Sequence, residues 1–195
     1  MRPQLSRLIV AAVILSAGSV AFAQGVMPAP GDTLPDIRGF DADGQLVEIV
    51  YSGHKYTLIN FWATWCEPCK GEIPMLEKVH RELGPEGLQM VGVTSERLSF
   101  EELAEFVDAF DATYSMFLIG EEYRKLWPGI RGNLPNSFLI DSEGRLVRRY
   151  VGASEAQIVA LEADLAAAIA GRPLGQMVMP GADDVVRGGT DKAPN

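Results

Sequence analysis

The stretch that decides the fold of this chain is Asn60-Phe61-Trp62-Ala63-Thr64-Trp65-Cys66-Glu67-Pro68-Cys69-Lys70. It continues an apolar, strand-like run that begins at Tyr56, and a helix is expected to follow from about Glu67 to Leu83. Cys66 and Cys69 are the only two cysteines of the chain. Two cysteines separated by two residues, where a strand passes into a helix, are typical of a redox-active pair.

The position of these cysteines at a helix start has a chemical consequence. A thiol in the first helical turn lies beside unpaired backbone N–H groups and the positive end of the helix dipole. Both favour the thiolate, which is the form that attacks a disulfide. Pro68 fits this place, because a proline in the first turn loses no hydrogen bond through its missing N–H.

Three alternatives remain for the cysteine pair. A structural disulfide would close so short a loop that it would add very little stability. A zinc site needs about four ligands, and only His54 and His80 could be added to the two sulfurs. Two buried thiols without a shared role are the third alternative. The redox pair is the favoured interpretation, and neither a metal nor a cofactor is expected.

The segment from Phe61 to Cys69 resembles the active-site segment of thioredoxin-like proteins, and most closely that of extracytoplasmic TlpA/ResA/CcmG-type thiol-disulfide oxidoreductases. Several separate motifs share the similarity, which covers roughly residues 30–171. The resemblance implies an α/β thioredoxin-like sandwich, in which helices flank a central mixed β-sheet and an extra N-terminal β-hairpin precedes the core. It also implies that Cys66 is an exposed nucleophile and Cys69 a shielded resolving thiol.

Hydrophobic periodicity along the rest of the chain predicts alternating strands and helices. Two capping boxes mark helix starts, one formed by Ser99 with Glu102 and the other by Ser154 with Gln157. Such an order fits an α/β sandwich with a mixed sheet. Further elements are expected as strands at 46–50, 58–62, 88–93, 116–119, 137–140 and 145–147, and as a short helix at 121–126.

Leu134-Pro135 is the second motif that the resemblance provides. It matches the cis-proline loop that packs against the cysteine pair in thioredoxin-like proteins, whereas a trans-proline before a strand is the alternative. A cis bond turns the backbone so that Leu134 can pair with an extended substrate strand. Substrate binding is therefore expected at Leu134, Pro135, Trp65 and Pro68. Trp62 is expected to shield the cysteines. The alternative is that Trp62 is simply a core residue.

Asn60 stands where typical thioredoxins carry a buried aspartate that accepts the proton of the resolving thiol, so this task must lie elsewhere. Glu72, three residues after Cys69, matches the glutamate of the Cys-x-x-Cys-x-x-Glu pattern in ResA-like proteins. A carboxyl group in a partly apolar pocket has a raised pKa and exchanges protons near neutrality. A surface glutamate is the alternative for Glu72, and Glu96 is a weaker candidate for an acidic group near the site.

Glu67 lies between the two cysteines and is expected to tune their redox chemistry. Together with Glu72 it would place negative charge near Cys66, which opposes the helix dipole and leaves the thiol less acidic than in a strong oxidant. A poorly stabilised thiolate makes the dithiol form a better electron donor. The sequence therefore predicts a reductant.

The predicted function is an exported thiol-disulfide oxidoreductase that reduces a disulfide of a partner protein. The resemblance implies apocytochrome c or a copper-site assembly protein as that partner, and a transmembrane thiol donor of the CcdA/DsbD type as the electron source. A thiol peroxidase or a thiol oxidant is the alternative within catalysis. A Cu(I)-binding chaperone is the alternative outside it, although no histidine follows His80 in this chain.

The N-terminal residues 1–23 are predicted to be a secretory signal peptide. Arg2 and Arg7 precede the apolar run Leu8–Ala17, and Ala21-Phe22-Ala23 has small residues at the cleavage positions. An uncleaved anchor is the alternative, but the apolar run is shorter than the about 20 residues of a membrane span. Export predicts a periplasmic or otherwise extracytoplasmic location, in which disulfides persist.

The remaining domain organisation follows from composition. Residues 24–32 are interpreted as a linker, 33–171 as the thioredoxin-like domain and 172–195 as a disordered tail rich in Gly, Pro and Asp. The chain has a formal net charge of −9, and loss of a signal peptide with two arginines would lower it further. So acidic a protein is not expected to bind nucleic acid.

Overall fold

The computed structural model of this chain describes residues 27–127 and 133–175. The predicted signal peptide lies outside the described residues, as do the start of the predicted linker and most of the predicted tail. Within the described residues no helix has both the length and the apolarity to cross a bilayer. The elements are β1 (Arg38–Phe40), β2 (Leu46–Glu48), β3 (Tyr56–Phe61), α1 (Glu67–Leu83), the 3₁₀ helix η3 (Gly84–Glu86), β4 (Leu88–Thr94), α2 (Phe100–Ala109), β5 (Ser115–Leu118), α3 (Glu121–Leu126), β6 (Asn136–Asp141), β7 (Leu146–Val151) and α4 (Glu155–Ile169).

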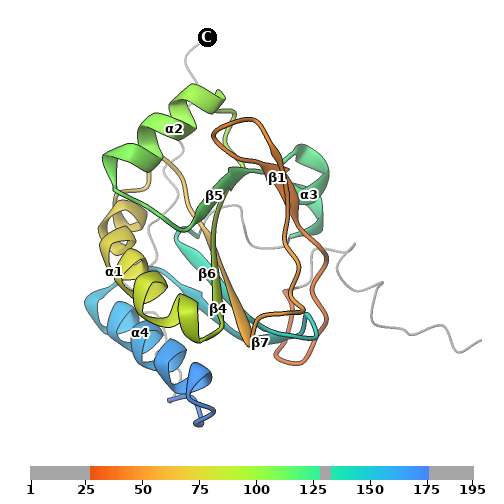
Figure 1. Cartoon of the computed structure of the whole chain (residues 1–195), viewed down its shortest axis with the longest axis vertical. Helices are drawn as coiled ribbons and strands as arrows, with labels where there is room; N and C mark the ends of the chain where they lie inside the picture. Colours follow the sequence, from red (N-terminus) through yellow and green to blue (C-terminus); the bar gives the residue numbers. More distant parts are fainter. Residues whose placement is uncertain (1–26, 128–132, 176–195) are drawn as a thin grey trace, which may run out of the picture.

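A seven-stranded mixed sheet in the order β2-β1-β5-β4-β3-β6-β7 forms the centre of the molecule. β4 runs parallel to both β3 and β5, and the other neighbouring strands are antiparallel. Helices α1, α2 and α4 lie on one side of the sheet and α3 on the other (Figure 1). The predicted α/β sandwich with a mixed sheet and an N-terminal hairpin, here β1–β2, is confirmed.

The central strands are buried on both faces, and their side chains alternate between two hydrophobic clusters. In β3, Leu58 packs under α1 and α4, whereas Ile59 and Phe61 point to the opposite cluster. That second cluster includes Trp127, whose ring lies 5.4 Å from those of both Phe61 and Phe138. Burial on both sides fixes the position of the chain at the end of β3, where the cysteine segment begins.

Helix α1 has the predicted bounds, and its apolar stripe is buried at Ile73, Leu76 and Val79. The sequence interpretation overlooked Pro74, which lies inside the helix and removes one backbone N–H from its ladder of hydrogen bonds. Both predicted capping boxes are present, at the starts of α2 and α4. Local hydrogen bonding therefore places these two helix starts where the sequence predicts them.

Strand β1 was not predicted as a separate element, because Arg-Gly-Phe lacks β-branched residues. Gly39 lies at its centre, and a Cβ there would collide with the carbonyl oxygen of Leu118 on β5. Glycine thus permits the close approach of β1 to the sheet. At the other edge, β7 extends to Val151, beyond the predicted end at residue 147, since it pairs with β6 as far as Asn136.

The described chain continues four residues beyond the predicted domain boundary at residue 171. Leu174 packs against the cluster under α1 and α4, and the N–H of Gly175 donates to Asp164 Oδ1 at 2.8 Å. Asp164 is itself buried and also accepts from Arg148 and Tyr150. The start of the segment after α4 is therefore held to the domain by specific contacts.

Candidate active site

Cys66 and Cys69 form a disulfide at the start of α1, with 5.3 Å between their Cα atoms. Cys66 is the N-cap residue in an extended conformation, and its Sγ accepts a hydrogen bond from the Cys69 N–H at 3.3 Å. The Cys66 N–H donates to the carbonyl of Ala63 at 3.1 Å, which closes a turn after β3. A helix N-terminus thus points at the sulfur of Cys66, an arrangement that favours a thiolate once the disulfide is reduced.

The expected exposure of Cys66 is wrong for this disulfide form. Its exposed fraction is 4% and that of Cys69 is 0%, and both belong to the cluster under α1. The physical reason is packing, because the N-cap of α1 at Cys66 lies in the same hydrophobic cluster as Cys69. The residues that are exposed beside the disulfide are Trp65, Glu67 and Pro68.

The Leu134–Pro135 peptide bond is cis, as predicted. β6 pairs antiparallel with β3, and Asn136 is the register partner of Phe61, so Pro135 precedes β6 at the end of the sheet where the cysteine segment begins. Leu134 is half-buried and packs against the cluster that contains both cysteines. Among the described residues no backbone group of Leu134 has a hydrogen-bond partner, whereas the carbonyl of Pro135 accepts from Gly152 at 2.9 Å.

Glu72 is buried, with an exposed fraction of 2%, so its alternative as a surface glutamate is wrong. Asn60 Nδ2 donates to Glu72 Oε1 at 2.7 Å and to Ser137 Oγ at 2.9 Å. Burial raises the pKa of Glu72 to about 8, although the hydrogen bond from Asn60 lowers it. Glu72 follows Cys69 by three residues on one helix, which places both side chains on the same face. A carboxyl group that titrates near neutrality therefore lies in the next turn after the buried cysteine.

The two carboxylates do not place negative charge beside Cys66 in the way that the sequence interpretation expected. A pKa of about 8 keeps Glu72 mostly protonated at pH 7. Glu67 is charged but exposed, and its Oε1 lies 2.7 Å from Nζ of Lys70. This neighbouring cation and the surrounding solvent offset its field at the sulfur.

Glu96 holds the loop between β3 and α1. Its Oε2 accepts the Thr64 N–H at 2.6 Å, and its Oε1 accepts the Thr64 hydroxyl at 3.0 Å. The sequence analysis treated Glu96 as a weak candidate, although its position shortly after a strand could have placed it near the site. Glu96 follows β4, which is parallel to β3, and the carboxyl ends of parallel strands meet at one edge of a sheet. Thr64 was not singled out by the sequence.

The two tryptophans of the segment have different surroundings. Trp62 is buried and stacks on Phe106 with ring centroids 4.2 Å apart. It therefore belongs to the core, which was the alternative interpretation of this residue. Trp65 has an exposed fraction of 68% and adjoins Cys66 in the sequence. Its indole offers a large apolar surface next to the disulfide, which suits contact with another protein.

The histidines take no part in this arrangement. His80 is half-buried on α1, and its ring faces Tyr114 at 6.0 Å. Within residues 27–127 and 133–175, no group of three or more His, Cys, Asp or Glu side chains could hold a metal ion. The structure thus brings no further metal ligands to the two sulfurs among the residues it describes.

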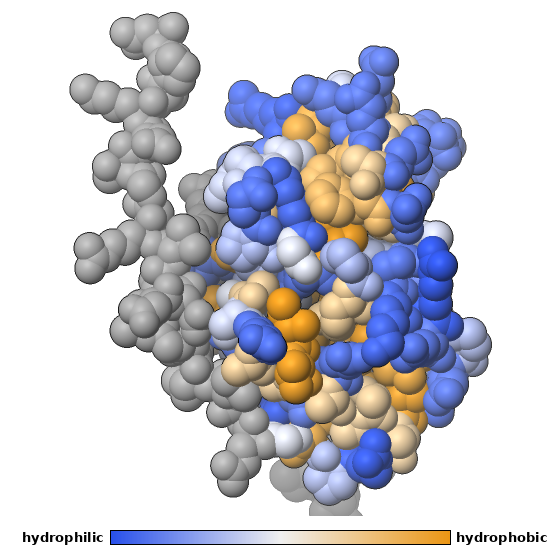
Figure 2. Space-filling model, turned by 90° about the vertical axis from the view of Figure 1, so that its left-hand side faces the viewer, coloured by the Kyte–Doolittle hydropathy of each residue, from blue (hydrophilic) through white to orange (hydrophobic). Residues whose placement is uncertain are grey.

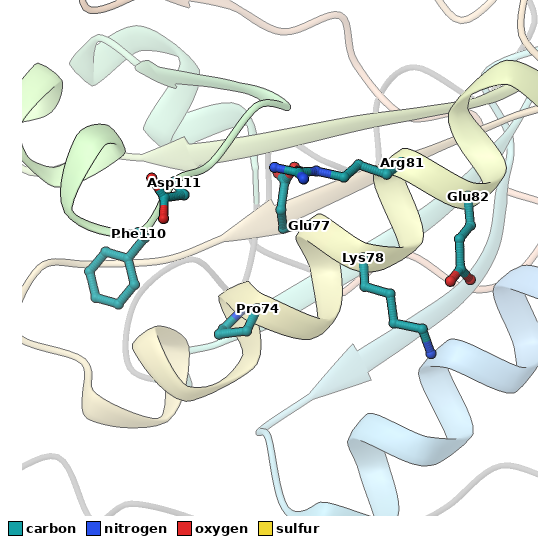
Figure 3. A pocket seen from close by; sticks show the side chains of 7 residues that line it. All are labelled: Pro74, Glu77, Lys78, Arg81, Glu82, Phe110 and Asp111. Atoms are coloured by element: carbon teal, nitrogen blue, oxygen red, sulfur yellow. Dashed lines mark hydrogen bonds and ion pairs between the residues drawn. The ribbon is translucent and has the colours of Figure 1, made fainter.

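A shallow groove on the helical side of the molecule is separate from the disulfide. Figure 2 views that side and shows hydrophilic side chains around smaller apolar areas. In Figure 3 the side chain of Arg81 extends toward Glu77, and Lys78 points toward α4, where it pairs with Glu162. None of the residues around the disulfide lines this groove; those that do are Pro74, Glu77, Lys78, Arg81, Glu82, Phe110 and Asp111.

Comparisons with known proteins agree with this geometry. Residues 30–149 match the family model described as AhpC/TSA family. The chain belongs to the AhpC/TSA family. Within it, the sequence is 28% identical over 154 residues to the thiol-disulfide oxidoreductase ResA of Geobacillus thermodenitrificans, an alignment of 78% of this chain and 86% of that protein. The corresponding ResA of Bacillus cereus is 26% identical over 122 residues, which cover 63% of this chain and 69% of the relative.

Solved structures show the same relationship. A crystal structure described as a thiol:disulfide interchange protein DsbE from Chlorobium tepidum is 28% identical and superimposes with a TM-score of 0.64. The superposition covers 73% of this chain and 99% of the Chlorobium tepidum chain. This AhpC/TSA-family protein is therefore a distant homologue of ResA and of DsbE-like proteins with a thioredoxin-like fold, and it carries their type of cysteine pair.

Proposed function

We propose that this protein is an extracytoplasmic thiol-disulfide oxidoreductase that reduces a disulfide of a partner protein. The observation that carries the proposal is the Cys66–Cys69 disulfide at a helix N-terminus, with the cis-proline Pro135 at the same end of the sheet. The buried carboxyl of Glu72 in the next helical turn adds a group for proton transfer. The homology to ResA and DsbE-like proteins supports the same class of reaction.

The reaction proceeds in two exchange steps. The thiolate of reduced Cys66 attacks one sulfur of the partner's disulfide, and the other partner sulfur leaves as a thiolate that takes up a proton. The Cys69 thiol then loses its proton to Glu72 and attacks Cys66 Sγ. The mixed disulfide breaks, the second partner sulfur leaves and is protonated, and the Cys66–Cys69 bond remains. Two electrons have then passed to the partner.

Glu72 serves as the proton acceptor for the second step. Cys69 has an exposed fraction of 0%, so bulk water cannot easily take its proton. A carboxyl group with a pKa of about 8 is close in basicity to a thiol of ordinary pKa, which lies near 8.5. Proton transfer between matched groups has a small energetic cost.

The surface beside the disulfide is suited to an extended partner segment. The backbone of Leu134 lacks hydrogen-bond partners among the described residues and can pair with such a segment as an added strand does. Trp65 and Pro68 supply an exposed apolar border on the helix side. Leu134 and Pro135 would then orient the partner's sulfur toward Cys66.

The electron donor and the partner are proposed from the family resemblance together with the predicted export. An oxidised pair in a disulfide-forming compartment needs a reductant, for which a transmembrane thiol donor of the CcdA/DsbD type is proposed. Apocytochrome c or a copper-site assembly protein is the proposed substrate. Glu72 is mostly neutral and the charge of Glu67 is offset by Lys70, which weakens the sequence argument for a reductant. The proposed direction therefore rests on the homology to ResA.

A thiol peroxidase is the second candidate, because the matched family model covers residues 30–149 and is that of AhpC/TSA. Turnover of hydrogen peroxide by the dithiol form, measured beside reduction of insulin, separates the two. We expect insulin reduction without appreciable peroxide turnover. The opposite result assigns the peroxidase, and loss of both activities together with stoichiometric Cu(I) binding assigns a copper chaperone.

The decisive experiment is trapping of the partner with Cys69→Ser. This variant keeps the attacking Cys66 but cannot resolve the mixed disulfide, so the partner stays bound through a reducible bond. Its mass identifies it after purification from periplasm. Cys66→Ser is the matched control and should trap nothing, because the remaining Cys69 is buried. Equal trapping by both variants would contradict the assignment of Cys66 as nucleophile.

A further inference from the structure

The side-chain amide of Asn60 connects Glu72 to Ser137 across three elements of the fold. Asn60 and Ser137 are register partners on β3 and β6, and Glu72 comes from α1. The amide nitrogen has two hydrogens, one for Glu72 Oε1 at 2.7 Å and one for Ser137 Oγ at 2.9 Å. All three side chains are buried. Groups held in this way by two paired strands have little freedom to reorient.

We propose that Asn60 and Ser137 are positioning residues, which hold the Glu72 carboxyl in the orientation and the protonation balance that proton exchange with Cys69 requires. This inference rests on the proposed function, because it concerns the proton step of that reaction. Asn60 acts directly through its hydrogen bond to the carboxyl. Ser137 acts through Asn60.

The role of Ser137 follows from the difference between the oxygen and the nitrogen of the Asn60 side-chain amide. If the amide of Asn60 turned over, its carbonyl oxygen would face the carboxyl of Glu72 and repel its charged form. The hydroxyl of Ser137 accepts the second N–H and so favours the orientation in which nitrogen faces Glu72. Removing this hydroxyl leaves a buried N–H without its partner and weakens that preference.

The hydrogen bond from Asn60 also affects the titration of Glu72. Burial raises the pKa of Glu72, and the donated N–H lowers it, since donation to a carboxylate stabilises the charged form. Loss of the N–H therefore shifts the titration further upward. Less of the carboxylate is then present at neutral pH, and the transfer of the Cys69 proton becomes slower.

Few other ionisable groups face this carboxyl. Tyr114 lies just before β5. Its pKa is raised mainly by burial and further by the nearby carboxylates of Glu72 and Glu77. The ionisable residues of β3 and β6, Tyr56 and Asp141, pair with each other at the far end of those strands, and β4 has none. On α4, Glu162 pairs with Lys78 and Asp164 with Arg148, and Glu155 is exposed at the start of the helix.

The first test titrates the side-chain carboxyl of Glu72 by ¹³C NMR in the oxidised full-length protein, with Glu72→Gln to assign the signal. In Asn60→Leu the midpoint should rise by about one pH unit, which corresponds to one hydrogen bond to a charged group. Ser137→Ala should give a smaller rise in the same direction. Ser137→Thr keeps the hydroxyl and should titrate like the wild type.

Thr57→Val is the matched control for stability. Thr57 is buried on the same strand β3 and donates its hydroxyl to Gln89 on β4 at 2.9 Å, so the variant loses a cross-strand hydrogen bond without touching Glu72. It should destabilise the fold but leave the carboxyl titration unchanged. If Asn60→Leu fails to fold, the comparison of Ser137→Ala with Ser137→Thr decides the proposal.

The second measurement is the pH profile for reduction of insulin by the dithiol form. The acidic limb of the wild-type profile should move to higher pH in Asn60→Leu and Ser137→Ala, in step with the NMR midpoint. Unchanged midpoints in both variants would overturn the positioning role, whatever happens to stability. A wild type that does not reduce insulin would instead refute the proposed function, while the NMR titration still reports on Asn60 and Ser137.

Discussion

Helix α1 carries two buried carboxyl groups with opposite electrostatic behaviour. Glu72 lies in the next helical turn after Cys69, receives one N–H from Asn60 and has its pKa raised by burial to about 8. Glu77 lies nearer the end of the helix. Burial acts on it too, but donors from Thr113 and Arg81 outweigh that effect and lower its pKa. It accepts both the N–H and the hydroxyl of Thr113, at 2.7 and 2.6 Å.

The comparison shows that burial alone does not decide what a carboxyl group does. The number of donors around it decides whether it remains charged. Glu77 has enough donors to stay charged, and it ties α1 to the chain before β5 as a structural element. Among the described residues Glu72 has one donor on one oxygen, and it titrates close to neutrality, where it can exchange a proton. The same residue type thus serves stability at one end of the helix and chemistry at the other.

The largest expected effect separates the two groups by activity. Glu72→Gln should lower the rate of insulin reduction at pH 7 by at least about a hundredfold, because loss of a general base costs about 10²–10⁴ in rate. Glu77→Gln should retain a rate close to that of the wild type. Steady-state turnover of both variants measures this difference. Equal losses in the two variants would mean that Glu72 has no special part in proton transfer.

The next effect separates them by stability. Glu77→Ala should lower the free energy of unfolding by about 2 kcal/mol, because it removes two hydrogen bonds from Thr113 and the ion pair with Arg81. Glu72→Gln should not lower it and should raise it, because the wild type must take up a proton on folding at pH 7 whereas glutamine is neutral in both states. Urea denaturation of the oxidised proteins provides the measurement. A greater loss from Glu72→Gln than from Glu77→Ala would reverse the assignment.

The smallest effect is a difference in pH dependence. The pKa of Glu72 rises from 4.5 to about 8 on folding, so the folded state binds the additional proton between these values. Its contribution to stability is complete below the lower pKa and is lost as the pH rises through the upper one, by at most about 1.4 kcal/mol per pH unit. Glu77 has a lowered pKa, and its contribution is lost on the acidic side instead.

Thermal or urea unfolding of the wild type and Glu72→Gln between pH 5 and 9 tests this sign. We expect the stability of Glu72→Gln to depend less on pH in that window than the stability of the wild type. Glu77→Gln should remove part of the stability loss below the ordinary carboxyl range. A wild type that becomes more stable from pH 6 to 8 through Glu72 would contradict the raised pKa.

Much of the fold was predictable because its signals are local. The bounds of α1, the capping boxes at Ser99 and Ser154 and the helix at 121–126 all depend on residues within a few positions of one another. β1 was not predictable in this way. Its strand character comes from contact with β5, which Gly39 permits, and a three-residue segment carries no periodicity of its own.

The residues of the candidate site also fall into those with local sequence signals and those that depend on tertiary contacts. Cys66 and Cys69 were found from their spacing, and Glu72 and Pro135 from motifs that resemble those of thioredoxin-like proteins; both kinds of signal are local. Glu96, which holds Thr64 at the active-site loop, depends on the parallel pairing of β3 with β4. The exposed state expected for Cys66 was wrong for the disulfide form, since burial is a property of packing.

The sequence by itself determined that a cysteine pair opens a helix after a buried strand, and that a carboxyl group follows one turn later. Only the tertiary structure decided that Asn60 and Ser137 meet beneath that helix and leave Glu72 with a single donor. The reason is physical. Spacing along a helix follows from its regular geometry, whereas the pKa of a buried group depends on every neighbour that folding brings to it from distant parts of the chain.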